Sequence, residues 1–209
     1  MKPKYIVLIY FLIISNFLFA QERPKLVVGI IVDQMRMEEL NRFRPYFVKD
    51  GFNRFLNKGF VYTNMHYNYV PTYTAPGHAS VYTGSTPSRH GIIANNWYRR
   101  SEGKEIYCVE DDTVQALGSP EREEEGKMSP RNLLATTITD ELRLSTNFRG
   151  KAFSVSMKDR AAVLPAGHFA NRAYWLSDNL NFISSTFYGS DFPQWVSDFN
   201  QGKKISKIY

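Results

Sequence analysis

Apolar residues fill the segment from position 25 to position 32 (KLVVGIIV) almost without interruption, and Asp33 follows directly. A continuous apolar run of this length is typical of a strand that is buried on both faces of a parallel sheet. Residues 152–157 form a second such run after Gly150, and residues 60–65 favour a further short strand. The pattern therefore predicts two buried strands and one shorter strand.

Helical patterns lie between these apolar runs. The apolar positions of residues 37–59 predict helices that break near Pro45 and Gly51, because proline and glycine interrupt regular helices. Residues 77–83 predict another helix, which the Gly-Ser-Thr-Pro sequence at positions 84–87 stops. Helices and strands therefore alternate along the chain.

Two further regions complete the pattern. Ser129 predicts the N-cap of a helix with Pro130 at its first position, and the apolar spacing extends this helix through Leu142. The polar stretch of residues 101–127 contains a cluster of glutamates and predicts a solvated surface loop. The alternation of strands with helices predicts an α/β fold with a mostly parallel central sheet.

The N-terminal segment has the layout of a secretory signal. Two lysines precede an apolar run from residue 5 to residue 19, which ends at Ala20 and the polar Gln21. We therefore expect residues 1–20 to be a signal peptide and the protein to be exported, to the periplasm or outside the cell. The run is shorter than the about 20 apolar residues that cross a membrane, so no stable membrane span is expected. Leu18 is not ideal for cleavage, which leaves an uncleaved anchor as the alternative.

Composition narrows the possible partners. The chain has 209 residues, of which 43% are hydrophobic and 22% charged, and this fits one globular domain. The formal net charge is +6, but the basic residues form no stripe, so no nucleic acid binding is expected. A mild positive charge suits anionic substrates. The single cysteine, Cys108, excludes a disulfide within the chain and a thiolate metal cage, and we expect a buried thiol without a role.

Charged residues follow the two predicted buried strands, where the chemistry of a parallel sheet is expected. Asp33 directly follows the first run, and a buried carboxylate there must be paired, cap a helix or bind a metal. Lys158 and Arg160 follow the second run and, in an extended segment, point to one face. An ammonium and a guanidinium that converge suit a phosphate dianion, and two solvent-facing charges are the alternative.

Polar residues near the helix predicted at residues 77–83 offer further chemistry. Thr74 lies between Pro71 and Pro76, just before this helix. A hydroxyl at a helix N-terminus lies among free backbone N–H groups that bind phosphate, but it attacks only when a base or metal lowers its pKa. A simple capping role is the alternative. Asn95 can donate to a phosphoryl oxygen or be an ordinary loop asparagine.

The chain has four histidines, at positions 66, 78, 90 and 168. No pair has the spacing of a local zinc motif such as H-E-x-x-H. Structural roles are therefore expected for all of them, and none is assigned as a metal ligand.

Taken together, four segments have a specific order and spacing: VDQMR at 32–36, TYTAPGHASVYTG at 72–84, SRHGIIANNWY at 88–98 and SMKDRAAVLPAGH at 156–168. From about residue 25 to the chain end, this pattern resembles the bacterial periplasmic alkaline phosphatases with a threonine nucleophile. These belong to the alkaline phosphatase superfamily, close to the nucleotide pyrophosphatase/phosphodiesterases. The resemblance implies a three-layer α/β sandwich, of which residues 21–209 are the N-terminal part of the catalytic domain.

The resemblance also implies roles for individual residues. Asp33 would be a zinc ligand, and Thr74 would be the nucleophile, bound to the same zinc as its alkoxide. Asn95, Lys158 and Arg160 would contact the phosphate of a small phosphate-ester substrate. The complete enzyme would use two zinc ions and a phosphothreonine intermediate, with further aspartate and histidine ligands beyond the end of this sequence.

Three interpretations remain open. Lys158 and Arg160 favour a phosphomonoesterase, because a monoester presents additional anionic oxygens to them. A phosphodiesterase or nucleotide pyrophosphatase would use the same Asp33 and Thr74. The third interpretation is a non-catalytic exported fragment, because these two residues cannot hold two zinc ions when each catalytic zinc needs about three protein ligands. We accordingly expect the chain by itself to be inactive.

Overall fold

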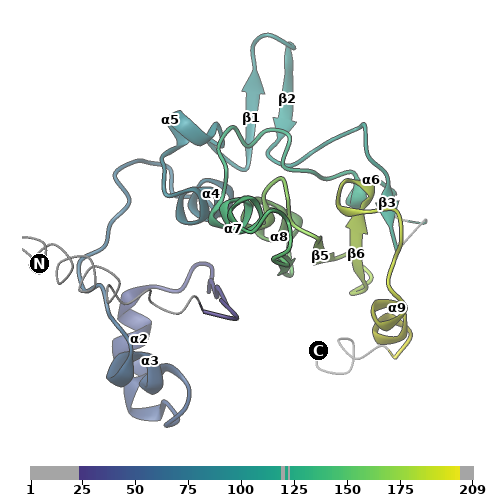
Figure 1. Ribbon diagram of the computed structural model, residues 1–209. Helices are drawn as coiled ribbons and strands as arrows, with labels where there is room; N and C mark the ends of the chain where they lie inside the picture. Colours follow the sequence, from purple (N-terminus) through teal and green to yellow (C-terminus); the bar gives the residue numbers. More distant parts are fainter. Residues whose placement is uncertain (1–23, 119–120, 122, 203–209) are drawn as a thin grey trace, which may run out of the picture. The chain divides into compact units, whose positions relative to one another are not determined.

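The computed structural model describes residues 24–118, 121 and 123–202 (Figure 1). The chain divides into two units, Met1–Val32 and Asp33–Tyr209, and each is described by itself. Only residues 24–32 of the first unit are described. The signal peptide predicted at residues 1–20 therefore lies outside the described residues.

Residues 25–32, expected to form a buried strand, form no helix or strand in the structure. Their apolar side chains, including Leu26, Val28 and Ile30, are exposed. A strand requires a neighbouring strand to take its backbone hydrogen bonds, and an apolar run does not supply that neighbour. The short strand expected at residues 60–65 is wrong for the same reason. An apolar pattern reports a preference for burial, whereas the pairing partner lies elsewhere in the sequence.

The helices expected at residues 37–59 are confirmed, together with their interruptions. Helix α2 (Met37–Phe43) leads into the 3-10 helix η1 (Arg44–Tyr46), which has Pro45 in its first turn. Helix α3 (Phe52–Lys58) then begins after Gly51 as its N-cap. The proline and the glycine therefore mark the ends of these helices, as the sequence predicts.

Helix α4 (Thr74–Thr83) begins earlier than predicted and ends where predicted. Pro76 lies in its first turn, where the missing N–H would have had no helical partner, so the proline does not delay the helix. Gly84 ends the helix in the left-handed region, with φ of 63°. The short helix α5 (Pro87–His90) follows.

The stretch of residues 101–127 is more ordered than the solvated loop that was expected. Strand β1 (Asn96–Arg99) and strand β2 (Lys104–Tyr107) form an antiparallel hairpin. Strand β3 (Ala116–Leu117) and helix α6 (Glu123–Gly126) lie further along. The expectation failed because single apolar residues are buried between charged ones, including Ile106, Cys108 and Val109. Cys108 is a buried free thiol, as expected, and burial raises its pKa to about 12.

The main sheet has four strands in the order β3-β6-β5-β4. Strand β4 (Phe153–Val155) is parallel to β5 (Arg172–Leu176), whereas β6 (Phe182–Ser185) is antiparallel to both β5 and β3. The α/β class is thus confirmed, and the sheet of the described residues is mixed rather than mostly parallel. The strand expected at residues 152–157 exists as β4 at the edge of the sheet, but its Phe153 and Val155 side chains are exposed rather than buried.

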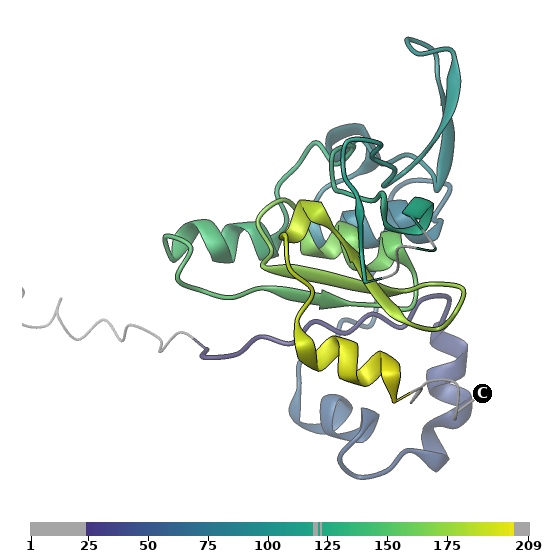
Figure 2. The same cartoon turned by 90° about the vertical axis from the view of Figure 1, so that its right-hand side faces the viewer.

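Helices cover both faces of this sheet (Figure 2). Ala173 and Trp175 on β5 belong to the core cluster that includes α8 (Asp159–Ala166). Tyr174 points to the opposite face, where its ring lies 5.7 Å from that of Trp195 on α9 (Gln194–Gln201). The 3-10 helix η3 (Thr186–Tyr188) connects β6 to this region.

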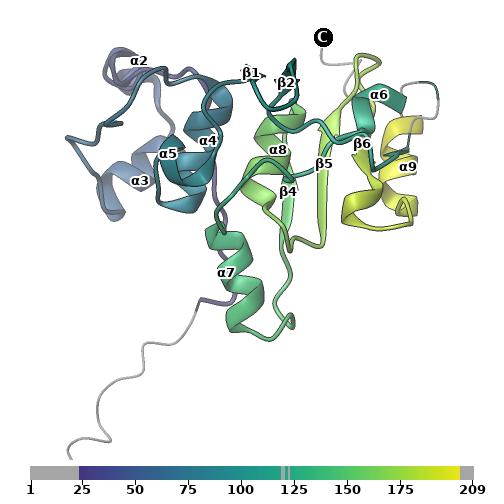
Figure 3. The ribbon, with the colours of Figure 1, turned by 90° about the horizontal axis from the view of Figure 1, so that it is seen from above.

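Helices α4 and α8 pack closely, as seen from above in Figure 3. Four fully buried alanines contribute to this region of the core, Ala75 and Ala79 from α4 and Ala162 and Ala166 from α8. Small side chains allow two helices to approach closely, which fixes the N-terminus of α4 relative to that of α8. The packing thus positions both candidate site segments.

The helix expected to begin at Ser129 begins instead at Ile138, as α7 (Ile138–Ser145). Thr137 and Asp140 form a capping box there, with the Thr137 side chain accepting from the Asp140 N–H. Ser129 instead donates to the buried Asp111 carboxylate at 2.5 Å. The capping box at Thr137, rather than Ser129, therefore marks the start of this helix. No helix among the described residues is both long and apolar enough to cross a membrane.

Candidate active site

The hydroxyl of Thr74 and the carboxylate of Asp33 lie together, although 41 residues separate them in sequence. Thr74 Oγ1 donates a hydrogen bond to Asp33 Oδ2 over 3.0 Å. Gln34, next to Asp33, has φ of 63°, a left-handed conformation that is uncommon for residues other than glycine. The turn that follows Asp33 therefore carries an uncommon backbone conformation.

Thr74 is the first residue of α4, and its side chain does not cap the helix. Tyr73 occupies the N-cap position and makes no side-chain capping hydrogen bond. The first turn of a helix leaves backbone N–H groups without helical partners and carries a partial positive charge. Thr74 is mostly buried at this end of the helix. The arrangement favours an anion next to the Thr74 hydroxyl.

Asn95 lies beside the same helix end. Its Oδ1 accepts a hydrogen bond from the Ala75 N–H over 2.9 Å. Because a backbone N–H can only donate, the Asn95 side-chain oxygen must face Ala75, and its NH₂ group remains a donor. The sequence prediction that Asn95 can donate to a phosphoryl oxygen therefore fits its orientation.

The structure corrects the expected arrangement of Lys158 and Arg160. Lys158 is extended and exposed as the N-cap residue of α8, whereas Arg160 already lies within that helix. The two side chains therefore do not share one face of an extended segment. The sequence had predicted an extended segment here, whereas helix α8 begins at Asp159, whose carboxylate accepts from the Arg160 N–H over 2.6 Å.

Arg160 instead contacts Tyr107 at the end of strand β2. The Arg160 guanidinium donates to Tyr107 Oη over 2.7 Å, and that hydroxyl donates to Asp159 Oδ1 over 2.5 Å. Burial, followed by the nearby Asp159 charge, raises the pKa of the Tyr107 phenol. The phenol is therefore protonated at neutral pH and links the carboxylate to the guanidinium.

Sequence reasoning missed three aromatic neighbours of these residues. Tyr107 lay in the stretch expected to be a loop, and no motif marked it. Tyr67 lies near the Asp33 carboxylate. Burial, then the neighbouring Tyr69 and then the Asp33 charge raise the pKa of the Tyr67 phenol. His78 was expected to be structural, and its Nδ1 lies 2.8 Å from the Thr74 carbonyl oxygen, which only accepts. Its i, i+4 spacing from Thr74 within the helix was a signal that could have been used.

The other buried histidine contacts are structural. His90 accepts the Ile92 N–H at its Nδ1 over 3.2 Å, and its Nε2 lies 2.9 Å from Ser80 Oγ. His168 lies between Asp140 and the carbonyl of Leu133. These contacts hold loops against helices and do not converge on Thr74.

A catalytic metal would find two oxygen ligands here. Asp33 and Thr74 present oxygens that are close enough to share one cation. Among residues 24–118, 121 and 123–202, no group of three or more His, Cys, Asp or Glu side chains could hold a metal ion. Since a catalytic zinc normally has about three protein ligands, the described residues fit part of such a site and not the whole of it.

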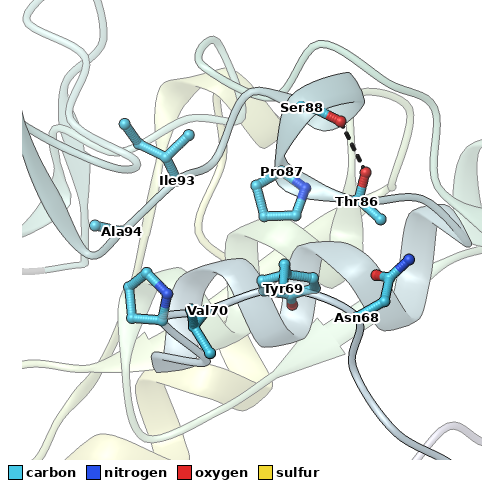
Figure 4. A pocket seen from close by; sticks show the side chains of 9 residues that line it. Asn68, Tyr69, Val70, Thr86, Pro87, Ser88, Ile93 and Ala94 are labelled. Carbon is cyan, nitrogen blue, oxygen red and sulfur yellow. Dashed lines mark hydrogen bonds between the residues drawn. The ribbon is translucent and has the colours of Figure 1, made fainter.

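A cavity of about 540 Å³ lies between the segment before α4 and the segment after it (Figure 4). Pro71 and Ala94 line it, and they lie near Thr74 and Asn95 in sequence. A hydrogen bond between Thr86 and Ser88 borders it. The cavity wall is thus continuous along the chain with both candidate site segments.

Comparison with known proteins assigns this chain to a family. Residues 27–205 match the family described as type I phosphodiesterase / nucleotide pyrophosphatase. This α/β chain, with a hydroxyl and a carboxylate paired at a helix N-terminus, belongs to that family.

Individual relatives are alkaline phosphatases. The chain is 53% identical over 188 residues to alkaline phosphatase PhoV from Synechococcus elongatus, covering 90% of this chain and 34% of the relative. It is 50% identical over 195 residues to alkaline phosphatase PafA from Elizabethkingia meningoseptica, covering 90% of this chain and 36% of the relative. The chain thus spans about a third of the length of these relatives.

A solved structure is similar over most of the chain. It is a crystal structure of a PafA variant in which a threonine is replaced by serine, and an asparagine, a lysine and an arginine by alanine. The TM-score is 0.86 at 47% identity, with 89% of this chain and 36% of that chain covered. The α/β arrangement described above is therefore the one found in this part of an alkaline phosphatase.

Proposed function

We propose that this chain is part of an enzyme that hydrolyses phosphate monoesters through a phosphothreonine intermediate at Thr74. The observation that carries the proposal is the hydrogen bond from Thr74 to Asp33 at the N-terminus of α4. It joins a nucleophile, a proton acceptor or metal ligand, and an anion-binding helix end in one place. The sequence identities of 53% to alkaline phosphatase PhoV and 50% to alkaline phosphatase PafA support the proposal.

Three further residues would bind the phosphate. The Asn95 NH₂ group would donate to a phosphoryl oxygen, since the side-chain oxygen is held by Ala75. Lys158 and Arg160, at the N-terminus of α8, would supply positive charge to a monoester dianion. Support comes from the PafA variant, whose substituted threonine, asparagine, lysine and arginine match the types and order of these residues.

Zinc would supply the remaining chemistry, and Asp33 and Thr74 would hold one of two ions. A bound divalent cation lowers the pKa of an alcohol and stabilises charge on phosphoryl oxygens. Two zinc ions would need further ligands, because the described residues hold no group of three or more His, Cys, Asp or Glu side chains that could bind a metal ion. Within this chain, the Thr74 hydroxyl donates its hydrogen bond to Asp33, and the partial positive charge at the N-terminus of α4 would favour the developing negative charge.

A phosphodiesterase is the second candidate function, favoured by the family to which the chain belongs. Both functions would use Asp33 and Thr74 in the same way. They differ in Lys158 and Arg160, because a diester carries one negative charge fewer at the transferred phosphorus. If monoesters are the proper substrates, replacing both Lys158 and Arg160 should weaken monoester hydrolysis more than diester hydrolysis. If diesters are the proper substrates, monoester hydrolysis should fall no more than diester hydrolysis.

The test uses the full open reading frame that contains this sequence, assayed with p-nitrophenyl phosphate and bis-p-nitrophenyl phosphate. Thr74→Ala should lower kcat/KM on both substrates by at least about a thousandfold, the scale of losing a nucleophile. Thr83→Ala, at the other end of the same helix, serves as the matched control and should retain activity. Unchanged turnover by Thr74→Ala would reject the proposal.

A second measurement addresses the non-catalytic interpretation. Zinc is titrated by calorimetry into the chain of 209 residues alone. Two oxygen ligands predict weak binding, with no site for two ions. Tight binding of two zinc ions per chain would refute the interpretation that this segment by itself is inert.

We propose further that the protein acts after export. The charged start, the apolar run and Ala20 support this. N-terminal sequencing of the protein from the periplasm or medium should then begin at Gln21. A protein that keeps its first residues and stays with the membrane fraction would instead have an uncleaved anchor.

A further inference from the structure

We propose that Tyr107 is a positioning residue for phosphate binding, because its hydroxyl accepts a hydrogen bond from the Arg160 guanidinium and its strand pairs next to Asn95. The inference rests on the proposed function, in which Arg160 binds the phosphate. It adds a residue that no sequence motif marked. It also gives the β1–β2 hairpin a role as the frame of the site.

The first argument is the isolation of the Arg160 side chain. Its side chain is 18% exposed, and its Nε is buried without a hydrogen-bond partner among the described residues. The Tyr107 hydroxyl is the one hydrogen-bond acceptor that its guanidinium has in that part of the chain, at 2.7 Å. The guanidinium also lies near the Tyr107 ring, 5.9 Å from the ring centroid. Tyr107 therefore restrains this side chain through both its hydroxyl and its ring.

The second argument is the hydrogen bond from the Tyr107 hydroxyl to the Asp159 carboxylate. Asp159 Oδ1 is 3.9 Å from the Arg160 guanidinium, too far for a hydrogen bond. Tyr107 lies between the two groups, accepts from Arg160 and donates to Asp159. Asp159 therefore makes no direct hydrogen bond to the guanidinium, and Tyr107 accepts only one of the guanidinium N–H groups.

The third argument is that the hairpin joins Tyr107 to Asn95. Asn96 pairs with Tyr107 at the base of the hairpin, and the Cys108 N–H donates to the Asn95 carbonyl over 2.9 Å. Asn132 adds a hydrogen bond to the Tyr107 carbonyl at 3.4 Å. The backbone hydrogen bonds of this hairpin therefore position both donors proposed for the phosphate. They hold Asn95 directly and hold Arg160 through Tyr107.

The test is a double-mutant cycle of Tyr107→Phe and Arg160→Ala in the full open reading frame, with kcat and KM measured separately on both p-nitrophenyl substrates. Removing one hydrogen bond to a charged group should lower monoester kcat/KM by about tenfold in Tyr107→Phe. The same change should have little further effect when Arg160 is already alanine, because the group that it positions is gone. Diester hydrolysis should fall less than monoester hydrolysis.

Tyr98→Phe is the matched control, because Tyr98 lies on the same hairpin and is exposed. It should leave both activities unchanged. If Tyr107→Phe is equally harmful with and without Arg160, or affects only thermal stability, the positioning role is wrong. If Arg160→Ala itself leaves monoester hydrolysis intact, the proposed role of Arg160 fails first, and the two failures are distinguishable.

Discussion

The side-chain oxygen of Asn95 accepts the backbone N–H of Ala75, the residue that follows Thr74, over 2.9 Å. This hydrogen bond orients the Asn95 NH₂ group as a free donor and predicts different effects for two substitutions. Asn95→Asp keeps the acceptor but loses the donor and adds a negative charge, so it should lower monoester kcat/KM by more than about a hundredfold. Asn95→Ala should lower it less, because no charge opposes the phosphate. Steady-state kinetics on the full open reading frame compare the two, and a better enzyme with aspartate would contradict the donor role.

The pair of His168 and Asp140 predicts a pH dependence of stability. Their hydrogen bond, 3.3 Å long, is the main cause that raises the pKa of His168. Burial acts to raise the pKa of Asp140, but hydrogen bonds from His168, Thr137 and Phe169 outweigh it, so this pKa is lowered. His168 therefore contributes stability that is fully present below its unfolded pKa of about 6.5 and is lost as pH rises through its higher folded value. Asp140 contributes stability above its unfolded pKa of about 3.9, and this is lost as pH falls through its lower folded value.

Urea unfolding of the chain at a series of pH values measures this dependence. His168→Gln should remove the loss of stability on the alkaline side of the plateau. His66→Gln is the matched control, because His66 is exposed and contacts only Asn64 among the described residues. A decline that persists unchanged without His168 would contradict the assignment.

The capping box of α7 predicts a local effect on stability. Thr137 is fully buried, and its side chain accepts from the Asp140 N–H over 3.0 Å. Thr137→Ala should lower the free energy of unfolding by about 1 kcal/mol, the typical cost of losing an N-cap. The neighbouring Thr136 is exposed, and Thr136→Ala should change it by less than about 0.5 kcal/mol. Equal effects of the two substitutions, measured by thermal or urea unfolding, would contradict the cap.

Local signals in the sequence predicted the parts of the fold that depend on local physics. Pro45, Gly51 and Gly84 mark helix ends because the fixed φ of proline and the free backbone of glycine act wherever these residues occur. The run at residues 25–32 failed as a strand because pairing depends on a partner distant in sequence. The same limit hid Tyr107, whose role comes from contacts with residues about fifty positions away. The sequence did single out Asp33, Thr74 and Asn95 as candidates. The structure brings Asp33 to Thr74 and Asn95 to Ala75, and their roles stay predictions.

Trapping of the phosphorylated enzyme tests the central claim most directly. The full open reading frame is mixed with p-nitrophenyl phosphate, quenched in acid, digested and analysed by peptide mass spectrometry. The peptide that contains Thr74 should carry one phosphoryl group, and the same peptide from Thr74→Ala should carry none. Phosphate found on another residue, or full turnover without any phosphate on Thr74, would contradict the account.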